Sequence, residues 1–251
     1  MNQRNPTENK SEAIGEYSLG CLEGAKTFEG NEKGILISQV RRGRYWGHPE
    51  LIRVLTEAGL HFDRIGKKII LGDLSLSRGG PTLTGHNSHQ TGLDVDIWFE
   101  MPNKNEKRNF RTIETLDMAP IGELKKDQID LIRYFTSRNE VERIFINPRM
   151  KKAICNHPQK HKLTTEELRK LRAWFGHDDH IHVRLFCPKD SPECISQKPV
   201  PEGDGCDQLD WWFSDEAQKD TPVYNSENQK TVYLDKIKNL PVRCEFYFKQ
   251  D

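Results

Sequence analysis

The stretches GLDVDIWF, at residues 92–99, and HIHVRLF, at residues 180–186, both alternate between polar and apolar side chains. Side chains two residues apart lie on the same face of a β-strand, so one face of each stretch is apolar. The opposite faces carry carboxylates in the first stretch and imidazoles with a guanidinium in the second: Asp94, Asp96, His180, His182 and Arg184. Both stretches therefore predict strands whose inner faces pack in a core and whose polar faces can form a site.

The remaining segments predict an α+β fold with a central antiparallel sheet flanked by helices and long disulfide-pinned loops. Further strands are expected at residues 35–40, 68–72, 141–146 and 241–248, the last at an edge. Helices are expected at about 49–58, 123–137 and 164–173, the first ending at Gly59. Residues 101–109 and 197–213 are expected to be polar loops, the second held by Cys206. We predict a flexible segment at residues 1–18 and one domain at residues 19–251.

The composition excludes several classes of protein. The 251 residues include 38 Lys and Arg and 38 Asp and Glu, so the chain has no broad positive field to hold nucleic acid or an anionic membrane. Hydrophobic residues make up 35% of the chain, and no apolar run is long enough to span a bilayer. We expect a well-solvated globular protein without a nucleic-acid partner or a membrane span.

Six cysteines favour an oxidising compartment. They form no Cys-x-x-Cys pair, and six cysteines allow fifteen disulfide connectivities, so the sequence alone does not fix the pairing. Six free thiols in a cytosolic enzyme are the alternative. Residues 1–18 have no apolar core and are not a secretory signal, so we expect that a signal was removed from an exported protein.

Histidines and aspartates in two short blocks predict a zinc site. His89 precedes Asp96 by seven residues, through a turn that contains glycine, and can meet it together with His182. Two imidazoles and one carboxylate leave a fourth position for water, which is the pattern of a catalytic zinc ion. A lone His-x-His is weak, however, and a protein without metal that carries surface histidines is the alternative.

The segments GHNSHQTGLDVDIW, at residues 85–98, and WFGHDDHIHVRLFC, at residues 174–187, closely resemble the signature segments of the penicillin-insensitive murein endopeptidases. That family belongs to a wider group of zinc peptidases with the lysostaphin-type enzymes, the D-Ala-D-Ala metallopeptidases and the hedgehog signalling domain. Further matches are SLGCLEGA, GRYWGHPELI, LSRGG, INPRMKKAIC and the order of the six cysteines. The resemblance covers roughly residues 12–250.

The resemblance implies a role for each matching residue. One zinc ion per chain would bind to His89, Asp96 and His182, and His180 would be the acid/base residue. His177 and His86 belong to the signature, His177 as a second catalytic candidate and His86 as a possible extra ligand. The implied disulfides are Cys21–Cys244, Cys155–Cys206 and Cys187–Cys194.

Other roles come from the residue types. Asp178 or Asp179 can orient an imidazole. Arg44, Arg78 and Arg184 are candidates to bind substrate carboxylates, although surface salt bridges explain them equally well.

The function that the resemblance implies is hydrolysis of peptide cross-links in periplasmic peptidoglycan, at the D-alanyl–meso-diaminopimelyl bond, without sensitivity to penicillin. A D-Ala-D-Ala carboxypeptidase or dipeptidase with the same zinc site is one alternative. A non-catalytic zinc-binding module is another. The sequence leaves open whether the protein is a monomer or a homodimer.

Overall fold

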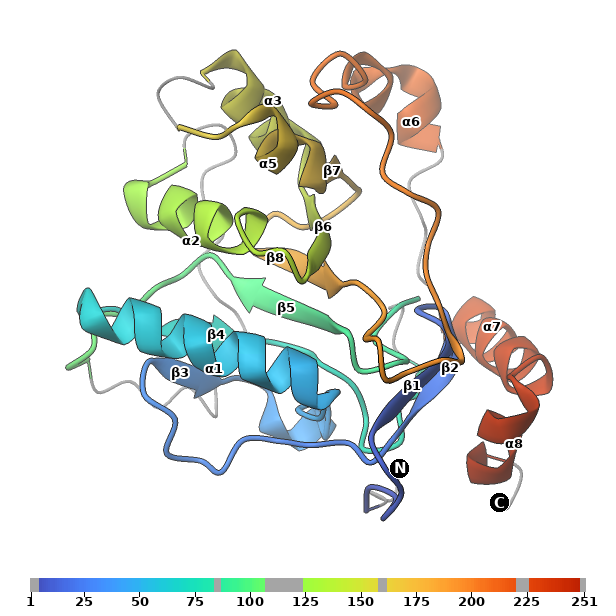
Figure 1. Cartoon of the computed structure of the whole chain (residues 1–251). Coiled ribbons are helices and arrows are strands. Elements are labelled where there is room, and N and C mark those ends of the chain that lie inside the picture. Colours follow the sequence, from blue (N-terminus) through green and yellow to red (C-terminus); the bar gives the residue numbers. More distant parts are fainter. Residues whose placement is uncertain (1–4, 84–86, 107–123, 158–161, 220–225, 249–251) are drawn as a thin grey trace.

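The computed structural model describes residues 5–83, 87–106, 124–157, 162–219 and 226–248 (Figure 1). A six-stranded sheet has the order β3-β4-β5-β8-β6-β7, and a smaller sheet has the order β2-β1-β9. The strands of the larger sheet are β3 (Ile35–Ile37), β4 (Ile69–Leu71), β5 (Asp94–Trp98), β8 (His180–Leu185), β6 (Val141–Ile146) and β7 (Leu171–Ala173). The smaller sheet comprises β2 (Leu19–Glu23), β1 (Glu12–Glu16) and β9 (Cys194–Ile195). The α+β prediction is confirmed.

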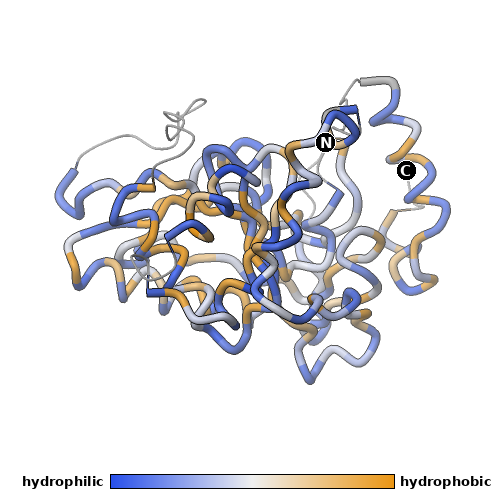
Figure 2. The backbone as a smooth tube through the Cα atoms, turned by 90° about the horizontal axis from the view of Figure 1, so that it is seen from above, coloured by the Kyte–Doolittle hydropathy of each residue, from blue (hydrophilic) through white to orange (hydrophobic). Residues whose placement is uncertain are grey.

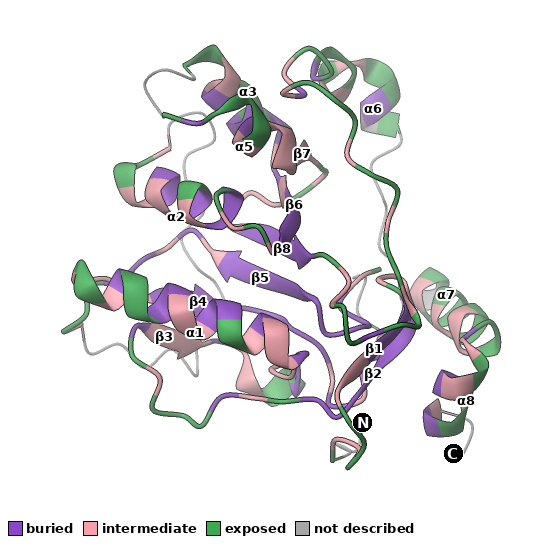
Figure 3. Ribbon diagram, viewed as in Figure 1, coloured by how far each residue is buried: buried purple, intermediate pink, exposed green. Residues whose placement is uncertain are grey.

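The centre of the large sheet is antiparallel, as expected. Strand β8 pairs antiparallel with both β5 and β6, and β4 pairs antiparallel with β5. Each outermost strand instead pairs parallel with its neighbour, so the sheet as a whole is mixed. Residues on both faces of β5 and β8 are buried, so Figure 3 shows these strands in purple over most of their length.

Helices α1 (Pro49–Arg64) and α2 (Lys126–Thr136) lie side by side over one face of the large sheet (Figure 1). The rings of Phe62 and Tyr134 join them, with centroids 5.4 Å apart. Hydrophobic and hydrophilic residues alternate along the helical coils of Figure 2, as expected for amphipathic helices. Because these helices cover the apolar face, the polar side chains of β5 and β8 point to the other face.

Helix α1 continues past Gly59, where we expected it to end. A side chain at this position would collide with the chain segment before β3, since an added Cβ would lie 2.6 Å from the Lys33 carbonyl oxygen. Glycine is therefore required here by close packing and not by a helix end. The helix ends at Arg64 instead.

Two other predicted boundaries and one predicted element type are also wrong. The strand expected at residues 35–40 stops at Ile37 and gives way to the 3₁₀ helix η1 (Val40–Arg42). The helix expected to reach about residue 173 is α5 (Thr165–Lys170), because Leu171 turns into extended backbone and pairs with Ile144 as part of β7. The edge strand expected at residues 241–248 is helix α8 (Val242–Phe248).

The C-terminal error has a clear physical cause. Cys244, Tyr247 and Phe248 follow the helical spacing of three and four residues, and they pack with Ile14 and Leu240 in a separate small core. Strand β1 borders this core and falls within residues 1–18, the segment expected to be flexible. The remaining helices are α3 (Pro148–Asn156), α6 (Asp215–Lys219), α7 (Ser226–Lys238) and the 3₁₀ helix η3 (Asp210–Phe213).

The structure contains the three disulfides implied by the family resemblance, Cys21–Cys244, Cys155–Cys206 and Cys187–Cys194. The first joins β2 to α8 and so connects the two ends of the chain. The second holds the connection at residues 197–213 to the end of α3, as expected for Cys206. No helix in the described parts of the chain is both long enough and apolar enough to cross a membrane.

The two disulfides with the most different spans predict different losses of stability. Cys21–Cys244 spans 223 residues and Cys187–Cys194 spans 7. In the chain-entropy description, replacing each pair by alanine should cost about 5 kcal/mol for the long span and about 2.5 kcal/mol for the short one. Urea unfolding of both double variants measures this difference. Equal losses would show that cross-linking of the unfolded chain does not govern stability here.

Candidate metal centre

His89, Asp96 and His182 come together on the polar face of β5 and β8. Asp96 and His182 lie directly opposite each other in the antiparallel pair. His89 reaches the same point from the loop before β5, where its backbone adopts a left-handed conformation with φ of 65°. All three side chains are buried. The strand pairing and one unusual loop residue therefore assemble the predicted ligand set.

The spacing of these atoms fits a zinc ion. His89 Nε2 lies 3.3 Å from Asp96 Oδ1, and His182 Nδ1 lies 3.1 Å from the same oxygen. One ligand atom from each residue falls within 4.8 Å of the others. Tetrahedral zinc with bonds of 2.0–2.1 Å places its ligand atoms about 3.3 Å apart. Burial lowers the pKa of His89, which favours the neutral imidazole that metals bind.

Asp94 determines which nitrogen of His182 faces the ligand set. His182 Nε2 donates a hydrogen bond to Asp94 Oδ1 at 2.7 Å, so in the neutral ring the Nδ1 that faces Asp96 carries the lone pair. Arg184 Nε donates to the same Asp94 oxygen at 2.7 Å. Burial opposes ionisation of Asp94, but Arg184 and His182 outweigh it and hold the pKa of this carboxyl well below its usual range. A carboxylate that orients a metal-binding imidazole in this way is typical of zinc sites.

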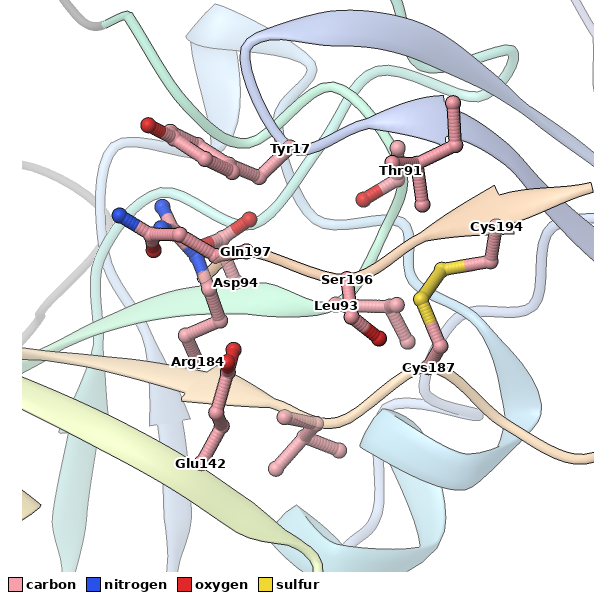
Figure 4. Close-up of a pocket in the computed structure, with 12 residues that line it drawn as sticks. Tyr17, Thr91, Leu93, Asp94, Glu142, Arg184, Cys187, Cys194, Ser196 and Gln197 are labelled. Carbon is pink, nitrogen blue, oxygen red and sulfur yellow. A yellow bond between two sulfur atoms is a disulfide. The ribbon is translucent and has the colours of Figure 1, made fainter. Parts of the chain in front are cut away.

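Arg184 in turn is enclosed by the small sheet and its connections. Its guanidinium carbon lies 3.7 Å from the centroid of the Tyr17 ring, and its Nη1 donates to Gln197 Oε1 at 2.6 Å. Figure 4 shows these side chains around a small cavity that Asp94 and the Cys187–Cys194 disulfide also line. The positions of Asp94 and Arg184 are thus fixed from the side away from the ligand set.

His180 borders the ligand set on its accessible side. Its Nε2 lies 3.7 Å from Asp96 Oδ1, and 17% of its side chain is exposed. Its Nδ1 donates to Asp179 Oδ1 at 2.6 Å, so in the neutral ring the lone pair lies on Nε2. Burial lowers the pKa of His180, but Asp96 and Asp179 outweigh burial and raise it above the usual value. Of the two aspartates expected to orient an imidazole, Asp179 contacts His180, whereas Asp178 accepts a hydrogen bond from Asn147.

His177 lies beside His180, with ring centroids 4.9 Å apart. Its Nδ1 donates to the Phe175 carbonyl oxygen at 2.8 Å, and its backbone is left-handed with φ of 58°. Burial and the neighbouring imidazoles lower the pKa of His177 to about 3. The ring is therefore neutral at pH 7, and its Nε2 can accept a hydrogen bond but not donate one.

Each of the arginines chosen from the sequence has a partner elsewhere in the fold. Arg44 is buried and pairs with Asp73 at 2.9 Å, and Arg184 is buried against Asp94. Arg78 lies over the ring of Tyr247 in α8 and donates to a backbone carbonyl of the N-terminal segment. These contacts give each arginine a structural role, and substrate binding by any of them stays a prediction. His86, the possible extra ligand, and residues 107–109 of the expected polar loop lie outside the described residues.

Sequence reasoning missed the aromatic side chains around the site. Phe145 of β6 lies opposite His182 in the strand pairing, with ring centroids 5.4 Å apart. The Trp98 ring packs against His180, and Trp98 Nε1 donates to Ser38 Oγ at 3.0 Å. The sequence does show Trp98 at the end of a strand that carries ligands. Nothing in the sequence around Phe145 reveals its neighbour on β8.

Known proteins resemble this chain over most of its length. A family model described as penicillin-insensitive murein endopeptidase matches residues 13–249. A penicillin-insensitive murein endopeptidase of Haemophilus influenzae is 36% identical over 225 residues, which cover 83% of this chain and 76% of the relative. Relatives of the same name from Yersinia enterocolitica and Klebsiella pneumoniae are 34% and 35% identical. Their alignments cover 83% and 86% of this chain, and 78% and 82% of the respective relatives.

These matches, together with the arrangement of the site, establish the class of the protein as a peptidase. The chain belongs to the penicillin-insensitive murein endopeptidase family. The two segments quoted from the sequence, which carried the resemblance, are those that build the candidate metal centre.

Replacing Asp94 by asparagine tests the orientation of His182. Asparagine keeps the shape but removes the charge that holds the Nε2 proton, so we expect zinc affinity to fall about 10–100-fold. Competition with a chromophoric chelator measures the affinity, and circular dichroism checks the fold. Asp130→Asn on α2 is the control for loss of one negative charge. Equal affinity in the Asp94 variant and the control would show that His182 does not depend on Asp94.

Proposed function

We propose that this protein hydrolyses the peptide cross-links of murein, at the D-alanyl–meso-diaminopimelyl bond, with one zinc ion held by His89, Asp96 and His182. One observation carries the proposal: three buried ligand atoms have the spacing of a zinc site beside a partly exposed imidazole. Family membership supports a peptidase, and the names of the relatives support murein as its substrate. Three protein ligands leave a position for water, which favours a catalytic role for the ion.

When bound, zinc supplies Lewis acidity, which polarises a carbonyl group and makes water acidic enough to lose a proton near neutral pH. His180 then serves as the general base. Asp179 fixes its proton on Nδ1, so Nε2 can accept the proton of the attacking water. As the C–N bond breaks, the same nitrogen delivers that proton to the leaving amine.

His177 has a supporting part in this scheme. Because its ring is neutral and its Nδ1 is occupied by the Phe175 carbonyl, it cannot act as an imidazolium toward a developing oxyanion. It can limit the movement of the His180 ring, which lies against it. We therefore assign proton transfer to His180 and a positioning role to His177.

The proposal also accounts for insensitivity to penicillin and agrees with a location of the protein outside the cytoplasm. Penicillin acylates a serine nucleophile, and the proposed reaction uses none. Disulfides persist in oxidising compartments, so three disulfides support a place outside the cytoplasm, and murein as substrate supports the periplasm.

Digestion of purified murein with and without a chelator tests the reaction. We expect cross-linked muropeptide dimers to become monomers in a zinc-dependent manner, with mass spectrometry as the readout. Release of terminal D-alanine with dimers left intact would identify a carboxypeptidase instead. Digestion that persists after the metal is removed and shown to be absent would contradict the proposal.

Replacement of His180 by alanine separates proton transfer from metal binding. The three ligands remain, so zinc should stay bound, whereas turnover of a cross-linked dimer should fall about 10²–10⁴-fold. Metal content and initial rates are measured on the same sample. His157→Ala, which changes an exposed imidazole after α3, is the matched control. Undiminished turnover in the His180 variant would remove this residue from the mechanism.

A further inference from the structure

Four aromatic side chains form a cluster beyond the metal centre. Trp174 and Phe175 follow β7, and Trp211 and Trp212 come from η3. The Trp212 ring lies 4.9 Å from that of Phe175, 5.0 Å from that of Trp211 and 5.9 Å from that of Trp174, between centroids. We call this cluster the aromatic shelf. Its two halves are far apart in sequence, so the contacts are made by the tertiary fold.

The aromatic shelf is partly open to solvent. Trp174 is 47% exposed and Trp211 is 42% exposed, although tryptophan is usually well buried. Contiguous exposed aromatic surface is costly in water and marks binding sites on soluble proteins. The large side chains of tryptophan also supply much contact area with little conformational entropy to lose. The shelf therefore has the character of a ligand platform.

Phe145 connects the aromatic shelf to the metal centre. Its ring centroid lies 5.4 Å from that of His182 and 5.8 Å from that of Trp174. The Trp174 ring is therefore no more than about 11 Å from a proposed zinc ligand. Phe145 also lies 6.3 Å from the ring of His177. A substrate held at the zinc site that continues past Phe145 would meet the aromatic shelf.

The length of a murein stem peptide matches this distance. Between a cross-link and the sugar that carries it lie three to four residues, which span roughly 10–14 Å when extended. The sugar of a substrate whose scissile bond is at the metal centre can thus reach Trp174. Pyranose rings present C–H bonds on their faces and polar groups at their edges. They pack face-on against indole rings by dispersion, with the polar edges left in water.

We propose that the aromatic shelf binds the N-acetylated sugar rings of the glycan strand to which the cross-link peptide is attached. This inference rests on the proposed function and adds a second part of the substrate to it. The enzyme would then recognise cross-links within the polymer better than free peptide dimers. Binding energy from the sugar would lower KM for glycan-bearing substrates and leave the chemical step unchanged.

Contacts with neighbouring elements hold each half of the aromatic shelf in place. The Trp174 backbone N–H donates to the Ile146 carbonyl oxygen at 3.0 Å, which continues the pairing of β6 with β7. The other half follows the Cys155–Cys206 disulfide, and Lys152 Nζ lies 4.4 Å from the centroid of the Phe213 ring. These contacts fix η3 against α3. A platform that is ordered before binding loses less entropy when the ligand arrives.

The double variant Trp174→Ala/Trp211→Ala tests the proposal with two substrates. One is a cross-linked peptide dimer without sugars, and the other is the same dimer with its disaccharides. We expect KM to rise about tenfold for the glycan-bearing dimer, with kcat unchanged, and both constants to stay the same for the sugar-free dimer. Phe246→Ala is the control, since this exposed residue belongs to α8, which Figure 1 shows at the other end of the molecule from α6, the helix that follows η3.

Direct binding separates failure of this inference from failure of the proposed function. Chitotetraose should quench tryptophan fluorescence of the zinc-loaded wild type but not of the double variant, whether or not murein is cleaved. Equal loss of activity on both substrates would overturn the inference in favour of a peptide subsite. Unchanged kinetics on both substrates would also overturn it. A change from dimer to monomer in sedimentation of the double variant, with chitotetraose binding unaltered, would assign the surface to contact between copies of the chain.

Discussion

The register between β5 and β8 is the constraint on which the rest of the molecule depends. It places Asp96 opposite His182 and Asp94 opposite Arg184, so two of the proposed ligands and the pair that orients His182 arise from alternate rungs of one ladder, with Val95 opposite Val183 between them. Side chains alternate between faces of a strand, and a slip by one residue would turn these groups into the core. The apolar residues between them prevent such a slip, because α1 and α2 bury them on the other face. Core packing and site geometry therefore require the same register of β5 and β8.

Charged groups also position one another within the site. Arg184 balances the buried carboxylate of Asp94 through a direct hydrogen bond, so Asp94 stays ionised where burial alone would favour its neutral form. Asp94 can then hold the proton of His182. Asp179 has the equivalent task for His180, nearer to solvent. Each of the two imidazoles on β8 is thus oriented by its own carboxylate, with the buried ring directed to the proposed metal position and the accessible ring beside it.

The sequence predicted those parts of the molecule that depend on local pattern. Alternation located β5 and β8, and residue types with their spacing identified His89, Asp96 and His182 together. It did not reveal that residues 241–248 form a helix, because a short apolar run fits either period until its partner in the core is known. The hydrogen bond of Asp94 to His182, and the contact of Trp174 with Trp212, are set by strand register and by a disulfide. Neither leaves a local signal.

The left-handed backbone of His89 and His177 has a consequence for how the protein evolves. Such a conformation costs a side chain with a Cβ about 1–2 kcal/mol, which the surrounding packing must offset. Glycine would remove this cost at either position, but it would also remove an imidazole. Selection for a more stable fold and selection for an intact centre therefore oppose each other at these two residues. Substitutions that would stabilise the fold at these two residues would therefore remove a group from the candidate site.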